Sequence, residues 1–177
     1  MYTLYFGERR AHFLAMPRTG SKACRDALRA QGAVAHGGHH SIDVFPTVVQ
    51  DDDLVMSTVR NHFDWFVSFW YLNGCPDKFD NYVTHVCDQS EWIRRNRDCS
   101  RCELYWKYAP LCNVIIRYEN LENDINEAMR EYGFPTLTLK QTGEKKPRPY
   151  QTYYKPATIQ KVIRLFNDEL VKYGYEF

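Results

Sequence analysis

A short polar run, Pro17-Arg18-Thr19-Gly20-Ser21-Lys22, has the residue types of an anion site. It follows an apolar segment and leads into a helix-like pattern that Gly32 should end. Backbone N–H groups at a helix start have no acceptor within the helix, and the helix dipole there is positive, so phosphate or sulfate is held well. Arg18 and Lys22 would add positive charge, and the two hydroxyl side chains between them would add donors. An ordinary strand, turn and helix with surface charges is the alternative.

A second candidate anion site lies at Arg60. Residues 54–59 have the pattern of a buried strand, and in open α/β sheets ligands bind at the carboxyl ends of strands. Phe63, Phe66, Val67, Trp70 and Tyr71 then form the apolar stripe of a helix. Ser68 lies off this stripe, so we do not expect the core to need it. For Arg60 the alternative is a structural ion pair.

Two glycines and two histidines, Gly37-Gly38-His39-His40, indicate a loop that could bring imidazole close to a substrate. Histidine titrates near neutral pH and is the commonest general base. A solvated loop histidine is the alternative. Cys99 and Cys102 form a lone CxxC that could bind zinc with Cys87 or His85, but no second closely spaced pair exists, so we expect mostly free thiols.

The supporting elements alternate between strands and helices, which predicts an α/β fold with a mainly parallel sheet. With 177 residues, of which 44% are hydrophobic, the chain can bury one core, so we expect one domain over residues 1–177. The expected strands lie at residues 12–16, 32–36, 54–59 and 112–118, and the expected helices at 21–31, 42–50, 63–73, 79–87, 101–108, 121–132 and 156–173.

Charge and hydropathy limit the partners. The net charge of +1 argues against nucleic-acid binding by bulk electrostatics. The first ten residues lack the apolar core of a signal peptide, and no apolar run reaches membrane-spanning length, so we expect a cytoplasmic protein with no membrane partner.

Several segments together resemble sulfotransferases that use 3′-phosphoadenosine-5′-phosphosulfate (PAPS). The matches follow the family's order through most of the chain and leave residues 76–110 unaccounted for. They are Pro17–Lys22 for the 5′-phosphosulfate loop, Arg60-Asn61 and Ser68–Tyr71 for the 3′-phosphate motif, Ile116–Leu121 for the RYEDL segment, Tyr153-Tyr154 with Tyr173–Phe177 for the carboxyl end, and Gly38–Ser41 with Phe45 for the Gly-His-x-Ser segment of heparan-sulfate 2-O-sulfotransferases.

The resemblance implies a P-loop-like three-layer fold, with a central sheet between helices. It implies PAPS as sulfuryl donor, PAP as product, no metal, and a hydroxyl-bearing acceptor, either a carbohydrate or a small molecule. The implied roles are His39 as catalytic base with His40 as fallback, Arg18 and Lys22 at the leaving phosphate, Thr19, Gly20, Ser21, Lys22 and Ala23 as the 5′-phosphosulfate cradle, Arg60 and Ser68 at the 3′-phosphate, and Lys146 and Arg148 as a basic flap.

Two departures from the family pattern bear on activity. The loop lysine of the family is Arg18 here, and a loop threonine or serine is replaced by Lys22. Proton donation to the bridging oxygen would then shift to Lys22, because a guanidinium does not deprotonate. A non-catalytic nucleotide-binding protein of the same fold, or a small P-loop kinase, are the alternatives. The kinase is disfavoured because GxxxxGK[ST] is absent.

Overall fold

A computed structural model of the chain describes residues 1–36, 49–75, 77–96 and 109–140, together with 148–177. Two compact units are present. The first contains residues 1–59 and 104–143, and the second contains residues 60–103 and 144–177. The expectation of one domain over the whole chain stays a prediction.

The first unit is built on a five-stranded mixed sheet with the order β3-β1-β2-β4-β5. Strands β2, β4 and β5 are parallel, whereas β1 runs antiparallel to both β2 and β3. The prediction of an α/β fold is confirmed, but the mainly parallel sheet is not, because the hairpin of β1 and β2 was not foreseen. The strands are β1 (Tyr2–Phe6), β2 (Arg9–Leu14), β3 (Val34–Ala35), β4 (Leu54–Val59) and β5 (Val114–Arg117).

Strand β4 lies at the centre of the parallel part, and all six of its residues are buried. Its register places Leu54 beside Ala11 of β2 and Met56 beside Val114 of β5. A strand that is covered on both sides is rich in apolar residues, as Leu54, Val55, Met56 and Val59 are here, which is why its position could be predicted.

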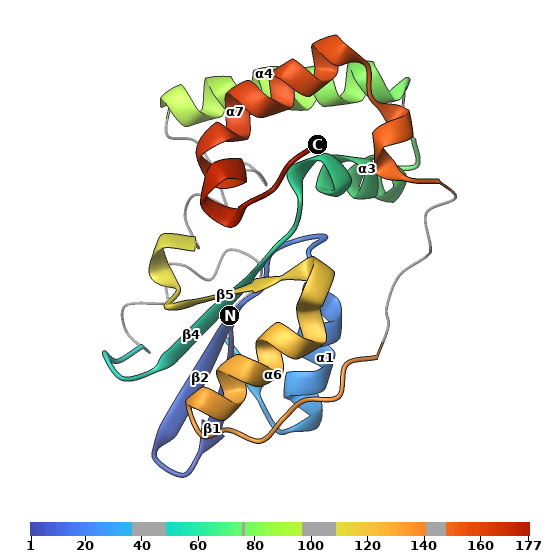
Figure 1. The fold of residues 1–177 in the computed structure, drawn as a ribbon. Helices are drawn as coiled ribbons and strands as arrows, with labels where there is room; N and C mark the ends of the chain where they lie inside the picture. Colours follow the sequence, from blue (N-terminus) through green and yellow to red (C-terminus); the bar gives the residue numbers. More distant parts are fainter. Residues whose placement is uncertain (37–48, 76, 97–108, 141–147) are drawn as a thin grey trace. The chain divides into compact units, whose positions relative to one another are not determined.

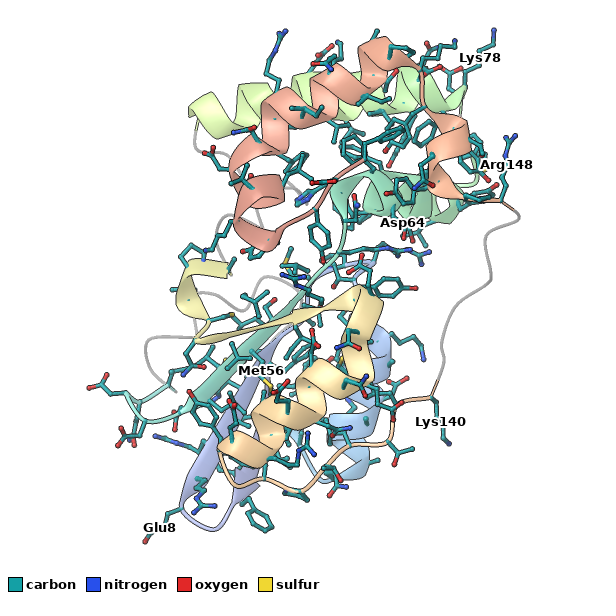
Figure 2. The ribbon with its side chains drawn as sticks, in the orientation of Figure 1. Glu8, Met56, Asp64, Lys78, Lys140 and Arg148 are labelled. Atoms are coloured by element: carbon teal, nitrogen blue, oxygen red, sulfur yellow. The ribbon has the colours of Figure 1, made fainter. Side chains whose placement is uncertain are left out.

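Two helices of the first unit, α1 (Ser21–Ala30) and α6 (Leu121–Glu131), contribute to one core with the sheet. Figure 1 shows both helices next to the strands, and Met56 of β4, which is labelled in Figure 2, belongs to the same core. This core indicates a layer of helices on one face of the sheet. Within the described residues, the second helical layer of the predicted three-layer fold is not confirmed. Two short 3-10 helices, η2 (Ala109–Leu111) and η3 (Tyr118–Asn120), flank β5.

The second unit consists of helices α3 (His62–Leu72), α4 (Phe79–Asn96) and α7 (Pro156–Tyr173), with the 3-10 turn η4 (Tyr150–Tyr153). Helices α4 and α7 lie side by side (Figure 1). Helix α7 begins at a proline and ends at Gly174 in the left-handed conformation, as its sequence predicts. Aromatic rings fill the space between the helices. They include Phe63, Phe66, Phe79, Tyr154 and Phe166.

Three predictions fall wholly or mostly outside the described residues. They are the helix over 42–50, the helix over 101–108 and the CxxC at Cys99 and Cys102.

Candidate functional site

The turn between β2 and α1 has an unusual backbone. Arg18 has φ of 64° and Gly20, the N-cap of α1, has φ of 78°. A Cβ on Gly20 would lie 2.6 Å from Cδ2 of Leu121 and 3.0 Å from Cδ2 of Tyr118. Glycine is therefore required at position 20 both by its dihedral angle and by the lack of space. The predicted strand, turn and helix are confirmed.

The start of α1 presents donor groups next to this turn. The N–H groups of Ala23 and Cys24 both point to the carbonyl oxygen of Gly20, at 3.0 and 3.4 Å. The preceding amides of Ser21 and Lys22 have no acceptor within the helix, as at any helix start. Because the helix dipole is positive here, these two amides can hold an anion. Ala23 therefore contributes less to the predicted cradle than its two neighbours.

Thr19 has a different role from the one its residue type predicts. Its side chain is fully buried. Its hydroxyl donates to the carbonyl oxygen of Met16 at 2.9 Å and lies within hydrogen-bond distance of the Thr58 hydroxyl. The side chain therefore fastens the turn to β4 and is not turned toward a ligand. Only the backbone of Thr19 remains for the cradle.

Lys22 forms an ion pair with Asp26, one helical turn further along α1. The distance between Nζ and Oδ2 is 2.6 Å, and both side chains are exposed. The hydrogen bond from Lys22 is the main reason that the pKa of Asp26 is lowered. Asp26 was not foreseen as a partner, although the i,i+4 spacing in the sequence is the ordinary signal for such a pair.

Arg60 is buried and bonded to Asp64 in the first turn of α3. Its Nε and Nη2 donate to Oδ2 of Asp64 at 2.7 and 2.5 Å. This is the structural ion pair that was the alternative for Arg60. The adjacent Asn61 caps α3, because its side-chain oxygen accepts from the N–H of Phe63 at 3.0 Å. A phosphate at Arg60 would have to share the guanidinium with Asp64.

Ser68 is also buried, with only 4% of its surface exposed. The expectation that it lies away from the packed side of the helix is wrong. Its neighbours Val67 and Phe69 are buried too, so α3 is covered on more than one face at this point. A ligand could reach the Ser68 hydroxyl only if packing around it changed.

The remaining predicted site residues divide into two groups. The guanidinium of Arg148 lies over the ring of Tyr153, with 4.4 Å between Cζ and the ring centroid. His39, His40 and Lys146 lie outside the described residues.

A network of buried polar groups in the first unit was not foreseen from the sequence. His12 is fully buried, and its Nδ1 lies 2.9 Å from the Thr3 hydroxyl while its Nε2 lies 2.9 Å from Oδ2 of Asp53. Asp53 also accepts from Nε of Arg10 at 3.0 Å and from the N–H of Gln50 at 2.6 Å. No short sequence motif marks this network, because Thr3 and His12 meet only through the pairing of β1 with β2.

The protonation states of this network follow from burial and hydrogen bonding. Loss of water on burial is the main cause that lowers the pKa of His12, so the imidazole is neutral near pH 7. Burial alone would raise the pKa of Asp53, but the hydrogen bonds from Gln50, His12 and Arg10 outweigh it and hold that pKa below its usual value. A neutral ring that donates from Nε2 to Asp53 and accepts at Nδ1 from Thr3 satisfies every group. The network therefore joins β1, β2 and the start of β4 through side-chain hydrogen bonds.

Among the residues that the structure describes, no group of three or more His, Cys, Asp or Glu side chains is arranged to bind a metal ion. In the same part of the chain, every helix is too short or too polar to cross a membrane.

Comparisons of the chain with protein-family models, with curated proteins and with solved structures found no match.

Proposed function

We propose that this chain is a sulfotransferase that moves a sulfuryl group from PAPS to a hydroxyl of a carbohydrate or small molecule. The observation that carries the proposal is the turn between β2 and α1. Two left-handed residues, Arg18 and Gly20, bring the chain directly into the helix start, where the amides of Ser21 and Lys22 can hold an anion. The resemblance of the surrounding segments to PAPS-dependent enzymes selects the 5′-phosphosulfate as that anion.

In this proposal the protein positions the reactants and stabilises charge on the leaving phosphate, since in-line transfer needs little covalent help. Arg18 neutralises that charge. Lys22 releases Asp26 and donates a proton to the bridging oxygen. His39 removes the proton of the acceptor hydroxyl, with His40 as the fallback. The cationic side chains take the place that a metal has in kinases.

Three further assignments stay predictions. They are the 3′-phosphate at Arg60 and Ser68, the basic flap of Lys146 and Arg148, and the cytoplasmic location. The ion pair with Asp64 and the burial of Ser68 weaken the first of them.

A non-catalytic nucleotide-binding protein is the second candidate. The observation in its favour is that Lys22 and Arg60 each pair with a carboxylate one helical turn away, at Asp26 and Asp64. The pairing of Lys22 reduces the positive charge available to the leaving phosphate, and the pairing of Arg60 reduces that available to the 3′-phosphate. A protein of this kind would bind the donor and show no transfer.

The first test is a comparison of ligand-induced shifts in the unfolding midpoint, using 3′-phosphoadenosine-5′-phosphate, AMP and ATP with magnesium. We expect stabilisation by the 3′-phosphorylated nucleotide alone. The matched variant carries Arg60→Gln and Asp64→Asn together, so that no buried charge is left without its partner, and it should lose this shift. A larger shift with ATP and magnesium would reject the proposal in favour of a kinase.

Turnover separates the two remaining candidates. With PAPS and a panel of hydroxyl acceptors, His39→Ala should lower transfer by about 100-fold or more while nucleotide affinity is kept. Nucleotide binding with no transfer to any acceptor would support the non-catalytic protein.

A further inference from the structure

Two tyrosines and an arginine form a compact polar cluster in the second unit. The hydroxyls of Tyr71, on α3, and Tyr153, in η4, lie 2.7 Å apart. The guanidinium of Arg148 lies over the ring of Tyr153. Figure 2 shows Arg148 projecting outward from the chain just before η4. The phenol pair is therefore partly buried, and the exposed guanidinium of Arg148 lies next to it.

The cluster holds more hydrogen-bond donors than its own contacts use. Two phenols carry two protons, and their mutual bond uses one of them. The hydrogen bond with Tyr153 is the main reason that the pKa of Tyr71 is raised, to about 12, so Tyr71 keeps its proton at neutral pH. Arg148 is exposed, and its guanidinium lies over the Tyr153 ring. A guanidinium carries five N–H groups that can donate to a ligand.

Stacking makes this arginine a better anion receptor than an ordinary surface arginine. The guanidinium lies 4.4 Å from the centre of the Tyr153 ring, measured from Cζ, so the aromatic ring holds it in place. The contact also restricts a side chain that would otherwise lose much rotamer freedom on binding. Tyr153 is itself buried, and its ring is held by the rings of Trp70 and Phe79.

We propose that Arg148, Tyr71 and Tyr153 form a binding site for a tetrahedral oxyanion, namely the sulfate or phosphate group of an organic ester. The guanidinium edge would bind two oxygens, and the remaining phenol proton would bind a third. A planar carboxylate has only two oxygens and would leave that third donor without an acceptor. The site stands on contacts within the second unit, and it shares Arg148 with the basic flap of the proposed sulfotransferase.

The test is an NMR titration of the full chain with inorganic phosphate and with sulfate at constant ionic strength. The reporters are the Nε–H resonance of Arg148 and the ring resonances of Tyr71. We expect saturable shifts. Arg148→Gln should weaken the affinity about tenfold, Arg148→Lys about fivefold because the fork is lost, and Tyr71→Phe about threefold.

The matched control is Lys172→Gln, because Lys172 also lies over a tyrosine ring, that of Tyr173, at 5.5 Å. This variant should bind as the wild type does. Shifts that grow linearly without saturation, or equal affinity in wild type and Arg148→Gln, would overturn the site. The amides of Ser21 and Lys22 report separately on the turn before α1, so their titration tests the sulfotransferase proposal independently of this one.

Discussion

Arg60 and Asp64 form a nearly enclosed ion pair, in which two nitrogens of the guanidinium donate to one carboxylate oxygen. The side chains are only 7% and 18% exposed. Removing one partner of such a pair leaves a charge with little water around it, whereas removing both leaves neutral groups. The same guanidinium is the group predicted to bind a 3′-phosphate, so structure and function compete for it.

A double-mutant cycle measures this pair. We expect Arg60→Gln and Asp64→Asn each to lower the free energy of unfolding by about 1–3 kcal/mol, because each leaves a charged hydrogen-bonding group without its partner. The double variant should lose less than the sum of the two. Urea unfolding provides the measurement, and strictly additive losses would mean that the pair contributes no coupling energy.

A side chain at position 20 should destabilise the protein. Alanine there would need a positive φ and would place its Cβ 2.6 Å from Leu121. Gly7 is the matched control, because its φ is 61° and a Cβ there would meet nothing within 4 Å. We expect Gly7→Ala to cost about 1 kcal/mol in unfolding free energy and Gly20→Ala about 2 kcal/mol or more. Equal losses would show that the contact with Leu121 relaxes freely.

Much of the fold could be predicted because the elements concerned have one-sided or continuous apolar patterns. Helix α7 has a proline at its start and a glycine at its end, and β4 begins with the apolar run Leu54–Met56 and ends at Val59. Strand β1 has the reverse pattern. Its polar Thr3 is fully buried, while its apolar Tyr5 and Phe6 are each 51% exposed. Alternation therefore gave no signal, and without β1 the antiparallel half of the sheet could not be foreseen.

The candidate site was predictable to a different extent at each residue. The turn at Gly20 follows from local sequence, and the partners of Lys22 and Arg60 could have been read from the i,i+4 spacing of Asp26 and Asp64. The inward direction of the Thr19 hydroxyl could not be predicted from the sequence. Its partner Thr58 is distant in the chain and reaches it only through the packing of the sheet.

The pairing of Lys22 with Asp26 predicts a mild gain of function. In Asp26→Asn the lysine is released toward the helix start, so affinity for PAPS should rise about two- to fivefold, in line with the small energies of exposed ion pairs. Lys22→Gln should lower it. Isothermal titration calorimetry measures both. Asp88→Asn, which releases Lys161 from a similar exposed pair, should leave the affinity unchanged. A loss of affinity in Asp26→Asn would show that the carboxylate itself helps to order the site.

Acid should destabilise the protein through its buried neutral histidines. His62 is fully buried, and loss of water lowers its pKa to about 3, against about 6.5 for an exposed histidine. Between these two values the unfolded chain binds a proton that the folded chain does not, so the free energy of unfolding falls as the pH falls below about 6.5. The slope is at most about 1.4 kcal/mol per pH unit for this group. Burial lowers the pKa of His12 as well, so this residue acts in the same direction.

The measurement is urea unfolding at several pH values between 7 and 4.5, on wild type and His62→Phe. Phenylalanine keeps an aromatic ring against Phe166, whose centroid lies 4.2 Å from that of the imidazole. The variant should lose the part of the slope due to His62 and keep the part due to His12. His85→Gln, which removes an exposed histidine of α4, is the control for the loss of an imidazole. If His62→Phe keeps the whole slope, the acid sensitivity arises elsewhere, and the network of Asp53, His12 and Thr3 becomes the next place to test.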